Sequence, residues 1–536
     1  HLSIRRQRQM CIRDRLSYFF FPMLFCFIKF FIISVFFLMV GCGKNPSDSG
    51  IRLSLSSDIR GFDPAHAVDV RSGKIVSLVY DNLIRFGDST ELVPEIASQW
   101  KVSNDGKKYH FTIRKNAFFH DGTPVTAHDV VRSYERILNP KTLSPQSWMF
   151  KQIDGSLDFI EGSSQSVKGL IAKNDSSLII KLNAPFSPFI QYLAMPSSAI
   201  INYRGAGSIN EIPSGSGPWK LARWERGGKI QLTRNEKYWA RKPMESGLIF
   251  RIIPEAMTRS AEFEAGNLDL LTIPSTEIQR WNEHPKYGDR VVYVDELNIW
   301  YIGLNCAVPP FNDVRVRKAM NLSLDREKHL HLLVPGGKLA SGPIPPVLLK
   351  YDGFNPLPYN PEKAIRLLES CGYPQGFQTE LWVGGGSEMF HVLEAFQSDW
   401  SAVGINVKIV QSDWNVFKAA VRNGQPPMYY LNWTADYPDA ENFLYPLFYS
   451  TESMTKRNRY SNLILDDIIL KIQSLSYGTE RTSLIQKANS ILLDEVPWVF
   501  LWHRGNYNIT QTSISGYRHK LVFNAERFLY FEKKNG

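Results

Sequence analysis

The chain mixes two hydrophobic periods, one typical of strands and one typical of helices. Apolar residues occupy every second position from Ile51 to Leu55, which predicts a half-buried strand. A second run, from Trp100 to Ile113, alternates in the same way after Asp105-Gly106, so we expect a β-hairpin that turns at this pair. Strand patterns recur at 178–182 and 407–410.

Helical patterns follow residues that can begin a helix. Thr126 precedes apolar positions that share one helix face, and Asp129 stands at the third helical position, which predicts a capping box. Asp313 and Asn360 are also placed to cap helices, and Pro361 follows Asn360 at the first helical position. Strands and helices are therefore expected along the whole chain after residue 50.

The N-terminus has the pattern of a targeting segment. Residues 1–15 carry five arginines, and a mostly apolar run continues to Gly41 with Lys29 as its one formal charge. The run ends in LMVGC, which resembles a lipobox with Met39 where Leu is usual, so Cys42 is the expected site of lipidation. The first residue is His rather than Met, and the segment before the apolar run is expected to include non-native sequence. A polar linker, GKNPSDSG, follows.

Length and charge narrow the class of protein. A chain of 536 residues is expected to form more than one core. Its formal charge of +10 falls to +5 without residues 1–41, and no basic run remains, which argues against nucleic acid as the partner. Apart from the cysteines of residues 1–41 and Cys42, the chain contains Cys306 and Cys371. Two cysteines without a CxxC motif indicate neither a zinc ribbon nor a disulfide framework, and a single bridge between them stays open.

The stretch from Asn432 to Leu444, NWTADYPDAENFL, concentrates candidate chemistry. Asp439 precedes apolar residues as a helix N-cap would, so we expect a structural role for it. Asp436 lies before the Tyr437-Pro438 pair, on backbone that cannot be helical, and beside Trp433, an aromatic residue able to exclude water. A carboxylate in this setting is suited to binding a cation in a partly desolvated pocket.

Catalytic and metal-binding motifs are missing from the sequence. There is no GxSxG, no HExxH and no phosphate loop, and the 11 histidines are dispersed. His120 and Asp121 are adjacent, but neighbouring side chains on extended backbone point to opposite faces, so neither a metal site nor an acid–base pair is expected there. We therefore expect no enzyme, no metal and no cofactor. A lipid-anchored hydrolase with widely scattered residues is the runner-up among functional classes.

Several strings, in order, resemble the oligopeptide- and dipeptide-binding proteins of ABC transporters, the family 5 solute-binding proteins. They are VPEIASQW, DGKKYHFTIR and FFHDGTPVTAHDV within 93–130, PSGSGPW at 213–219, PPFNDVRVRKAMNLSLDR at 309–326, and the Trp433 to Asp436 segment. Ser216 and Trp219 depart from the Thr and Tyr usual in the family. In that family, the aspartate that matches Asp436 receives the free α-amino group of the ligand, and Trp433 would line a pocket for ligand side chains.

The resemblance implies an α/β fold with two lobes, of the type II-like periplasmic-binding-protein class, with a subdomain inserted in the first lobe. The boundaries it suggests are a signal peptide at 1–41, a lipidated cysteine and linker at 42–50, the start of lobe 1 at 51–85, the inserted subdomain at 86–205, the rest of lobe 1 at 206–300, lobe 2 at 301–500, and a C-terminal return to lobe 1 at 501–536.

The function implied is that of a monomeric lipoprotein in the periplasm or at the cell surface that captures peptides between closing lobes and delivers them to ABC permease subunits. Relatives that bind nickel chelates, haem, opines or sugars leave those ligands open. A peptide chaperone or adhesin on the same fold is a third alternative.

Overall fold

The computed structural model describes residues 50–204, 209–349, 351, 353–385 and 390–534, so the predicted signal segment and Cys42 lie outside the described residues. Residues 50–536 form one compact unit, and the lobe boundaries given above stay predictions. Within the described ranges, no helix is long and apolar enough to cross a membrane.

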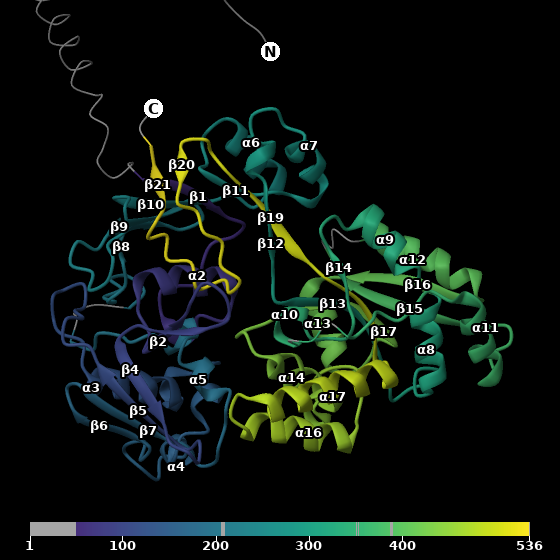
Figure 1. The fold of residues 1–536 in the computed structure, drawn as a ribbon, viewed down its shortest axis with the longest axis horizontal. Helices are drawn as coiled ribbons and strands as arrows, with labels where there is room; N and C mark the ends of the chain where they lie inside the picture. Colours follow the sequence, from purple (N-terminus) through teal and green to yellow (C-terminus); the bar gives the residue numbers. More distant parts are fainter. Residues whose placement is uncertain (1–49, 205–208, 350, 352, 386–389, 535–536) are drawn as a thin grey trace, which may run out of the picture. The chain divides into compact units, whose positions relative to one another are not determined.

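The first sheet has the strand order β1-β10-β9-β8 (Figure 1). Its strands are β1 (Ile51–Leu55), β8 (Trp219–Glu225), β9 (Lys229–Arg234) and β10 (Gly247–Ile252). The apolar positions of β1 are buried, as predicted from their alternation, and β1 pairs in parallel with β10. Helix α2 (Val70–Val79) begins at Asp69, whose side chain accepts a hydrogen bond from the Ser72 amide.

A separate four-stranded sheet lies between β1 and β8 in the sequence, with the order β4-β5-β7-β6. Its strands are β4 (Ala97–Val102), β5 (Lys108–Ile113), β6 (Leu170–Asn174) and β7 (Ser177–Lys181). The predicted hairpin is confirmed, because β4 and β5 pair in antiparallel fashion and Gly106 takes the positive φ that the turn requires. Short elements complete this part, namely β2 (Ile84–Phe86), β3 (Leu92–Pro94), α4 (Ser156–Ile160), α5 (Phe189–Tyr192) and the 3₁₀ helices Pro64–His66, Pro140–Thr142, Ser147–Phe150 and Pro196–Ser198.

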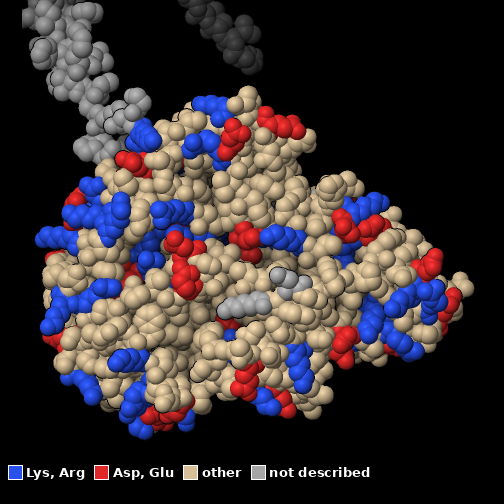
Figure 2. Space-filling view, in the orientation of Figure 1, with Lys and Arg blue, Asp and Glu red and all other residues tan. Residues whose placement is uncertain are grey.

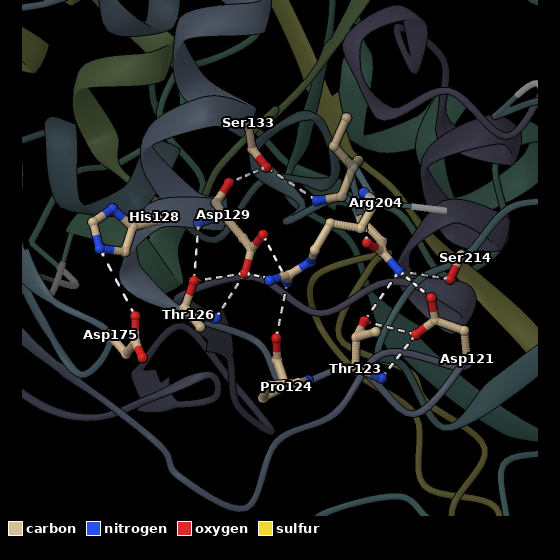
Figure 3. A network of polar contacts seen from close by, with 12 residues as sticks. Asp121, Thr123, Pro124, Thr126, His128, Asp129, Ser133, Asp175, Arg204 and Ser214 are labelled. Carbon is tan, nitrogen blue, oxygen red and sulfur yellow. Dashed lines mark hydrogen bonds and ion pairs between the residues drawn. The ribbon is translucent and has the colours of Figure 1, made fainter. Parts of the chain in front are cut away.

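Helix α3 (Ala127–Leu138) packs on this sheet and also holds the returning chain. Its predicted capping box is confirmed, with Thr126 and Asp129 each bonded to the other's backbone amide. Arg204 Nη2 donates to both carboxylate oxygens of Asp129, at 2.8 and 2.9 Å, and Asn202 Nδ2 donates to Asp121 at 2.6 Å (Figure 3). Ser133 accepts the Ile201 amide at 3.0 Å. Polar side chains of α3 and of the loop before it therefore bind residues 201–204, which lead back toward the first sheet.

The largest sheet has the order β14-β18-β13-β17-β15-β16. Its strands are β13 (Asn298–Leu304), β14 (Lys338–Leu339), β15 (Phe377–Gly384), β16 (Ile405–Ser412), β17 (Met428–Thr434) and β18 (Trp498–His503). The associated helices are α8 (Val314–Leu322), α9 (Arg326–Leu333), α10 (Pro346–Leu349), α11 (Pro361–Ser370), α12 (Phe390–Ala402), α13 (Trp414–Arg422), α14 (Tyr445–Phe448), α15 (Ser450–Lys456), α16 (Leu463–Ser474) and α17 (Thr479–Glu495). Asp313 and Asn360 cap α8 and α11 as predicted.

Cys306 and Cys371 are free thiols in the structure, so the bridge that the sequence left open is not formed. Cys371, just after α11, is only partly buried, unlike Leu368 on the helix. Its position just before Gly372 explains the difference, because the chain already turns away from the helix there with a φ of 89°.

Two chain crossings join the largest sheet to a three-stranded sheet with the order β11-β19-β12. Its strands are β11 (Leu270–Thr272), β12 (Val292–Asp295) and β19 (Gly505–Thr510), and nearby lie α6 (Ala256–Glu264), α7 (Ile278–Asn282) and the 3₁₀ helices Ser275–Glu277 and Gly288–Arg290. Only Glu296 and Leu297 separate β12 from β13, and only Arg504 separates β18 from β19.

These two crossings are bonded to each other. Asn298 Nδ2 donates to the Arg504 carbonyl at 2.9 Å, and the Arg504 amide donates back to Asn298 Oδ1 at 2.9 Å. Figure 1 shows β12 and β19 running side by side, as their antiparallel pairing requires.

The C-terminal segment packs against the first sheet. Strand β20 (Ile514–Ser515) pairs with β21 (Glu532–Lys533), and Phe528 and Phe531 are buried in the core under β1 and β10. Arg527 forms buried ion pairs with Asp81 and Glu95, the latter at 3.0 Å.

Candidate functional site

The candidate site forms where β17 ends. Trp433 is in the strand, and the chain bends from Asp436 to Pro438, as the Tyr437-Pro438 pair predicted. Asn442, on the following 3₁₀ helix η8 (Ala440–Phe443), holds the bend in place. Its Oδ1 accepts the Asp436 amide at 3.0 Å and the Trp433 indole N–H at 3.3 Å. One amide side chain thus fixes the backbone of Asp436 and the ring of Trp433 together.

Asp439 has the structural role predicted for it. Its carboxylate caps η8 by accepting the Glu441 amide at 2.9 Å. It also accepts two hydrogen bonds from Arg481 Nη2, at 2.9 and 3.0 Å, and one from the Tyr477 hydroxyl at 2.6 Å. Both partners of the ion pair are buried, with side-chain exposures of 1% for Asp439 and 4% for Arg481. The acid is fully engaged inside the protein and cannot reach a ligand.

Asp436 has opposite surroundings. Its side chain is exposed, and it forms no ion pair with any residue that the structure describes. The surrounding protein still desolvates the carboxyl enough to raise its pKa to about 6, although Arg457 and Asn442 act in the other direction. The Arg457 guanidinium lies over the Trp433 ring, 5.1 Å from its centre. Ionising this carboxyl is costly, and an added cation would offset the cost.

The Asp436 carboxyl opens into a cavity of about 500 Å³, which we call the acidic cavity. Its lining contains Asp436, Glu441 and Glu452 against Lys151 and Lys456, and Lys456 is paired with Glu452 at 2.6 Å. The remaining wall is aromatic and polar, formed by Trp148, Gln152, Phe186, Tyr192, Trp433, Tyr437, Asn442, Tyr445, Pro446 and Gln473. This size and lining are typical of small-molecule sites.

Glu441 is a buried acid in the lining of the acidic cavity. Its Oε2 accepts the Tyr437 hydroxyl at 2.5 Å and its Oε1 accepts Gln473 Nε2 at 2.6 Å. Burial raises its pKa to about 7, helped by the nearby charge of Asp439. Glu441 therefore has protein partners that Asp436 lacks.

Sequence reasoning found Trp433 and Asp436 but missed the rest of this wall. Trp148, Lys151 and Tyr192 come from the part of the chain around the β4-β5-β7-β6 sheet, more than 200 residues earlier. Arg457 comes just after α15, and Arg481 lies in α17. No spacing rule links such residues, and only the fold brings them together.

The other candidates have structural roles. His120 Nε2 lies 3.0 Å from the Gly217 carbonyl, and burial lowers the pKa of His120 to about 4, while Asp121 accepts hydrogen bonds from Thr123. His120 and Asp121 therefore form neither a metal site nor an acid–base pair with each other. No cluster of three metal-ligating side chains occurs in the described part of the chain. Basic and acidic side chains are interspersed on the face shown in Figure 2, unlike a nucleic-acid surface.

Comparison with known proteins gives one consistent result. The sequence pattern described as "Bacterial extracellular solute-binding proteins, family 5 Middle" matches residues 91–455. The chain is 28% identical to heme-binding protein A of Haemophilus influenzae, covering 85% of this chain and 87% of the relative. It is 26% identical to the dipeptide-binding protein of Escherichia coli, covering 82% and 86%.

Among solved structures, the chain resembles the ABC transporter-associated periplasmic binding protein DppA from Helicobacter pylori in complex with peptide STSA. The TM-score is 0.76 at 26% identity, with 90% of this chain and 98% of that chain covered. The α/β periplasmic-binding-protein fold predicted from the sequence is thereby confirmed.

Proposed function

Because the chain belongs to the family 5 bacterial extracellular solute-binding proteins, which supply ABC importers, we propose that its ligand is a peptide held by its amino end at Asp436. Like its relatives it is an extracytoplasmic binding protein and not an enzyme. The observation that carries the proposal is the Asp436 carboxyl, exposed in the acidic cavity without an ion-pair partner among the described residues.

A peptide fits this cavity better than the non-peptide alternatives do. An α-ammonium would satisfy Asp436 directly, and the aromatic wall with Trp433 leaves room for varied side chains. Haem, which the name of one relative suggests, presents carboxylates, and these would meet three acids in the same cavity. Nickel chelates, opines and sugars have no feature of the described residues in their favour.

The test combines one substitution with one change in the ligand. Losing one partner of a desolvated charge pair costs about 2 to 5 kcal/mol, so Asp436→Asn should weaken binding of a free-amine peptide by roughly 30-fold or more. The same peptide acetylated at its N-terminus should bind the native protein poorly and lose little further in the variant. Titration calorimetry on the four combinations gives the coupling between the two changes.

Glu452→Gln is the matched control, since it removes a cavity charge that Lys456 already neutralises. We expect it to change affinity by no more than about threefold, because exposed ion pairs contribute about 0 to 1 kcal/mol. Equal binding of acetylated and free peptides to the native protein would refute both the role of Asp436 and the peptide assignment.

We also propose that Cys42 is lipidated and tethers the protein to the membrane. Cys42→Ser should then leave an uncleaved precursor that takes up no labelled palmitate. Equal labelling of the variant and the native protein would disprove the anchor.

Closure of the lobes on the ligand, with delivery to the permease as a monomer, completes the proposal. The radius of gyration from small-angle scattering should fall when a bound peptide saturates the protein. An unchanged radius would favour a preformed groove, as a peptide chaperone or adhesin on this fold would have.

A further inference from the structure

A second cavity, of about 430 Å³, adjoins the residues just before the same bend. We call it the basic cavity. Thr434 and Ala435 line it, while the next two residues, Asp436 and Tyr437, line the acidic cavity. Its other walls are β1, α2 and the C-terminal segment from Tyr517 to Phe528. Four extended residues span at most ~14 Å, so both cavities adjoin one short piece of chain.

The charges of the basic cavity are opposite to those of the acidic one. Four of its lining residues are Lys or Arg, and two are Glu. Most of these have partners. Arg259 donates to the carbonyls of Ile253 and Pro254 at 2.8 and 2.7 Å, Lys520 pairs with Asp88, and Glu296 accepts Asn298 Nδ2 at 3.1 Å. Arg71 is exposed and donates to Ser56 at 3.3 Å.

Lys74 differs from these residues. It is half-buried on α2, and its ammonium lies 5.3 Å from the centre of the Phe528 ring. No carboxylate of the described residues lies within ion-pair distance of it. Burial lowers the pKa of Lys74, opposed only by the more distant charge of Glu526. A partly desolvated cation in a cavity is stabilised by any anion that enters.

Glu526 lines the same cavity, and its charge acts on Lys74. Its Oε1 accepts the Phe528 amide at 2.5 Å, and burial raises its pKa. His519, also in the wall, has its pKa lowered to about 4 by burial and by Lys74 and Lys520, so it is neutral near pH 7. Lys74 is thus a half-buried cation of this wall that forms no ion pair with the described residues.

Building on the function proposed above, we propose that Lys74 receives the free carboxylate of the ligand, so that the protein selects short peptides with both termini charged. The amino end would bind Asp436, and the backbone would follow the segment from Thr434 to Tyr437 into the basic cavity. The two cavities thus place a base and an acid against neighbouring residues of one chain segment. A short zwitterionic peptide matches that order of charges.

The test uses two peptides that keep the free amine and differ only at the other end, as acid or amide. We expect the native protein to bind the acid about tenfold more tightly than the amide, the equivalent of 1.4 kcal/mol. Lys74→Met keeps the aliphatic stem against Phe528 but removes the charge. It should bind the acid about tenfold more weakly than the native protein does and the amide equally well. Lys74→Arg should retain part of the preference.

Lys418→Met is the control for loss of a lysine near an aromatic ring. Its ammonium lies 5.4 Å from the centre of the Trp414 ring, and it lines neither cavity, so the preference for the acid should be unchanged. Thermal unfolding of each variant verifies folding.

The outcomes separate this inference from the proposed function. Equal affinity of the native protein for acid and amide overturns the role of Lys74, whatever the variants do, and leaves the amino-end proposal standing if acetylation still weakens binding. Loss of the preference in Lys151→Met rather than in Lys74→Met also overturns it, and places the carboxylate in the acidic cavity.

Discussion

Asp436 and Asp439 stand three residues apart on one bend, and their surroundings are opposite. Asp439 is buried against Arg481, Tyr477 and a backbone amide, so each of its oxygens has a partner. Asp436 is exposed in a cavity, and its ionised form is costly because the surrounding protein desolvates it and no described residue forms an ion pair with it. The same side chain therefore stabilises the fold at one position and is available to a ligand at the other.

The difference shows how the surrounding protein can fix the position of a cavity acid without forming an ion pair with it. The Asp439–Arg481 pair joins the bend to α17, and Asn442 fixes the backbone of Asp436 from the same 3₁₀ helix. Asp439, which is held by its buried partners, therefore helps to position the exposed Asp436. Substitutions at the two positions should accordingly affect different properties of the protein.

The largest effect is expected from Asp439→Asn, on stability. Removing one member of a buried ion pair leaves the other charge uncompensated, at a cost of about 3 to 5 kcal/mol. The free energy of unfolding, from guanidinium titration, should fall by that amount because Arg481 loses its counter-charge. Asparagine can still cap η8, so the local turn should persist.

The peptide affinity of the folded Asp439→Asn protein should be measured alongside its stability. We expect a change of less than about threefold, since this is within the 1 kcal/mol of a minor perturbation. Adding Arg481→Met should restore part of the stability, because no unpaired charge would remain. A loss of affinity as large as that of Asp436→Asn would mean that the two acids form one site.

The next effect is on the pH dependence of binding. The pKa of Asp436 is raised to about 6, so its carboxyl loses its charge as the pH falls below that value. Affinity for a free-amine peptide should drop about tenfold per pH unit below 6, in proportion to the ionised fraction, and decline again above the α-amino pKa of about 8.

Titrations from pH 4.5 to 8.5 check this profile, and Asp436→Asn is the control. The acidic limb should flatten in that variant. A limb that persists unchanged would assign the titration to another group of the cavity, with Glu441 as the first candidate because its pKa is raised to about 7.

A smaller effect is expected at Trp433. Its indole N–H donates to Asn442 and its ring lies against Arg457, so Trp433→Ala should admit water beside the carboxyl. Aromatic contacts of this kind contribute about 0.5 to 1.5 kcal/mol, which corresponds to a roughly two- to tenfold weaker affinity. Trp414→Ala, at an exposed tryptophan outside both cavities, should leave the affinity unchanged in the same titration.

The smallest effect is on the stability of Asp436→Asn. Because the folded pKa of Asp436 lies above its ordinary value, ionisation opposes folding at pH 7 and has no effect below about pH 4. After discounting for exposure, the variant should be more stable than the native protein by up to about 1 kcal/mol at pH 7 and equal to it at pH 4. A less stable variant at pH 7 would show that Asp436 has a structural partner.

Sequence patterns predicted the local parts of this molecule and could not predict the distant ones. The hairpin at Asp105-Gly106 and the caps at Thr126, Asp313 and Asn360 are set by residues within a few positions of each other. For the same reason, the cap at Asp439 could be predicted from its neighbours.

What completes the site could not be predicted in this way. Arg481 lies 42 positions after Asp439, and Trp148 and Lys151 reach the acidic cavity from another sheet. Resemblance to a family identified Asp436, but neither its raised pKa nor the open cavity is encoded in any short pattern. Those properties arise from how many protein atoms surround the carboxyl, which depends on the whole fold.

The paired crossings at Glu296-Leu297 and Arg504 have a mechanical consequence. A single flexible linker would let the joined sheets twist and slide in many directions, and ligand capture would have to suppress all of them. For the closure proposed above, two short crossings bonded to each other through Asn298 would favour bending about one axis. Little conformational freedom then remains to be lost when the protein closes, so more of each contact's energy is available to hold a small cargo.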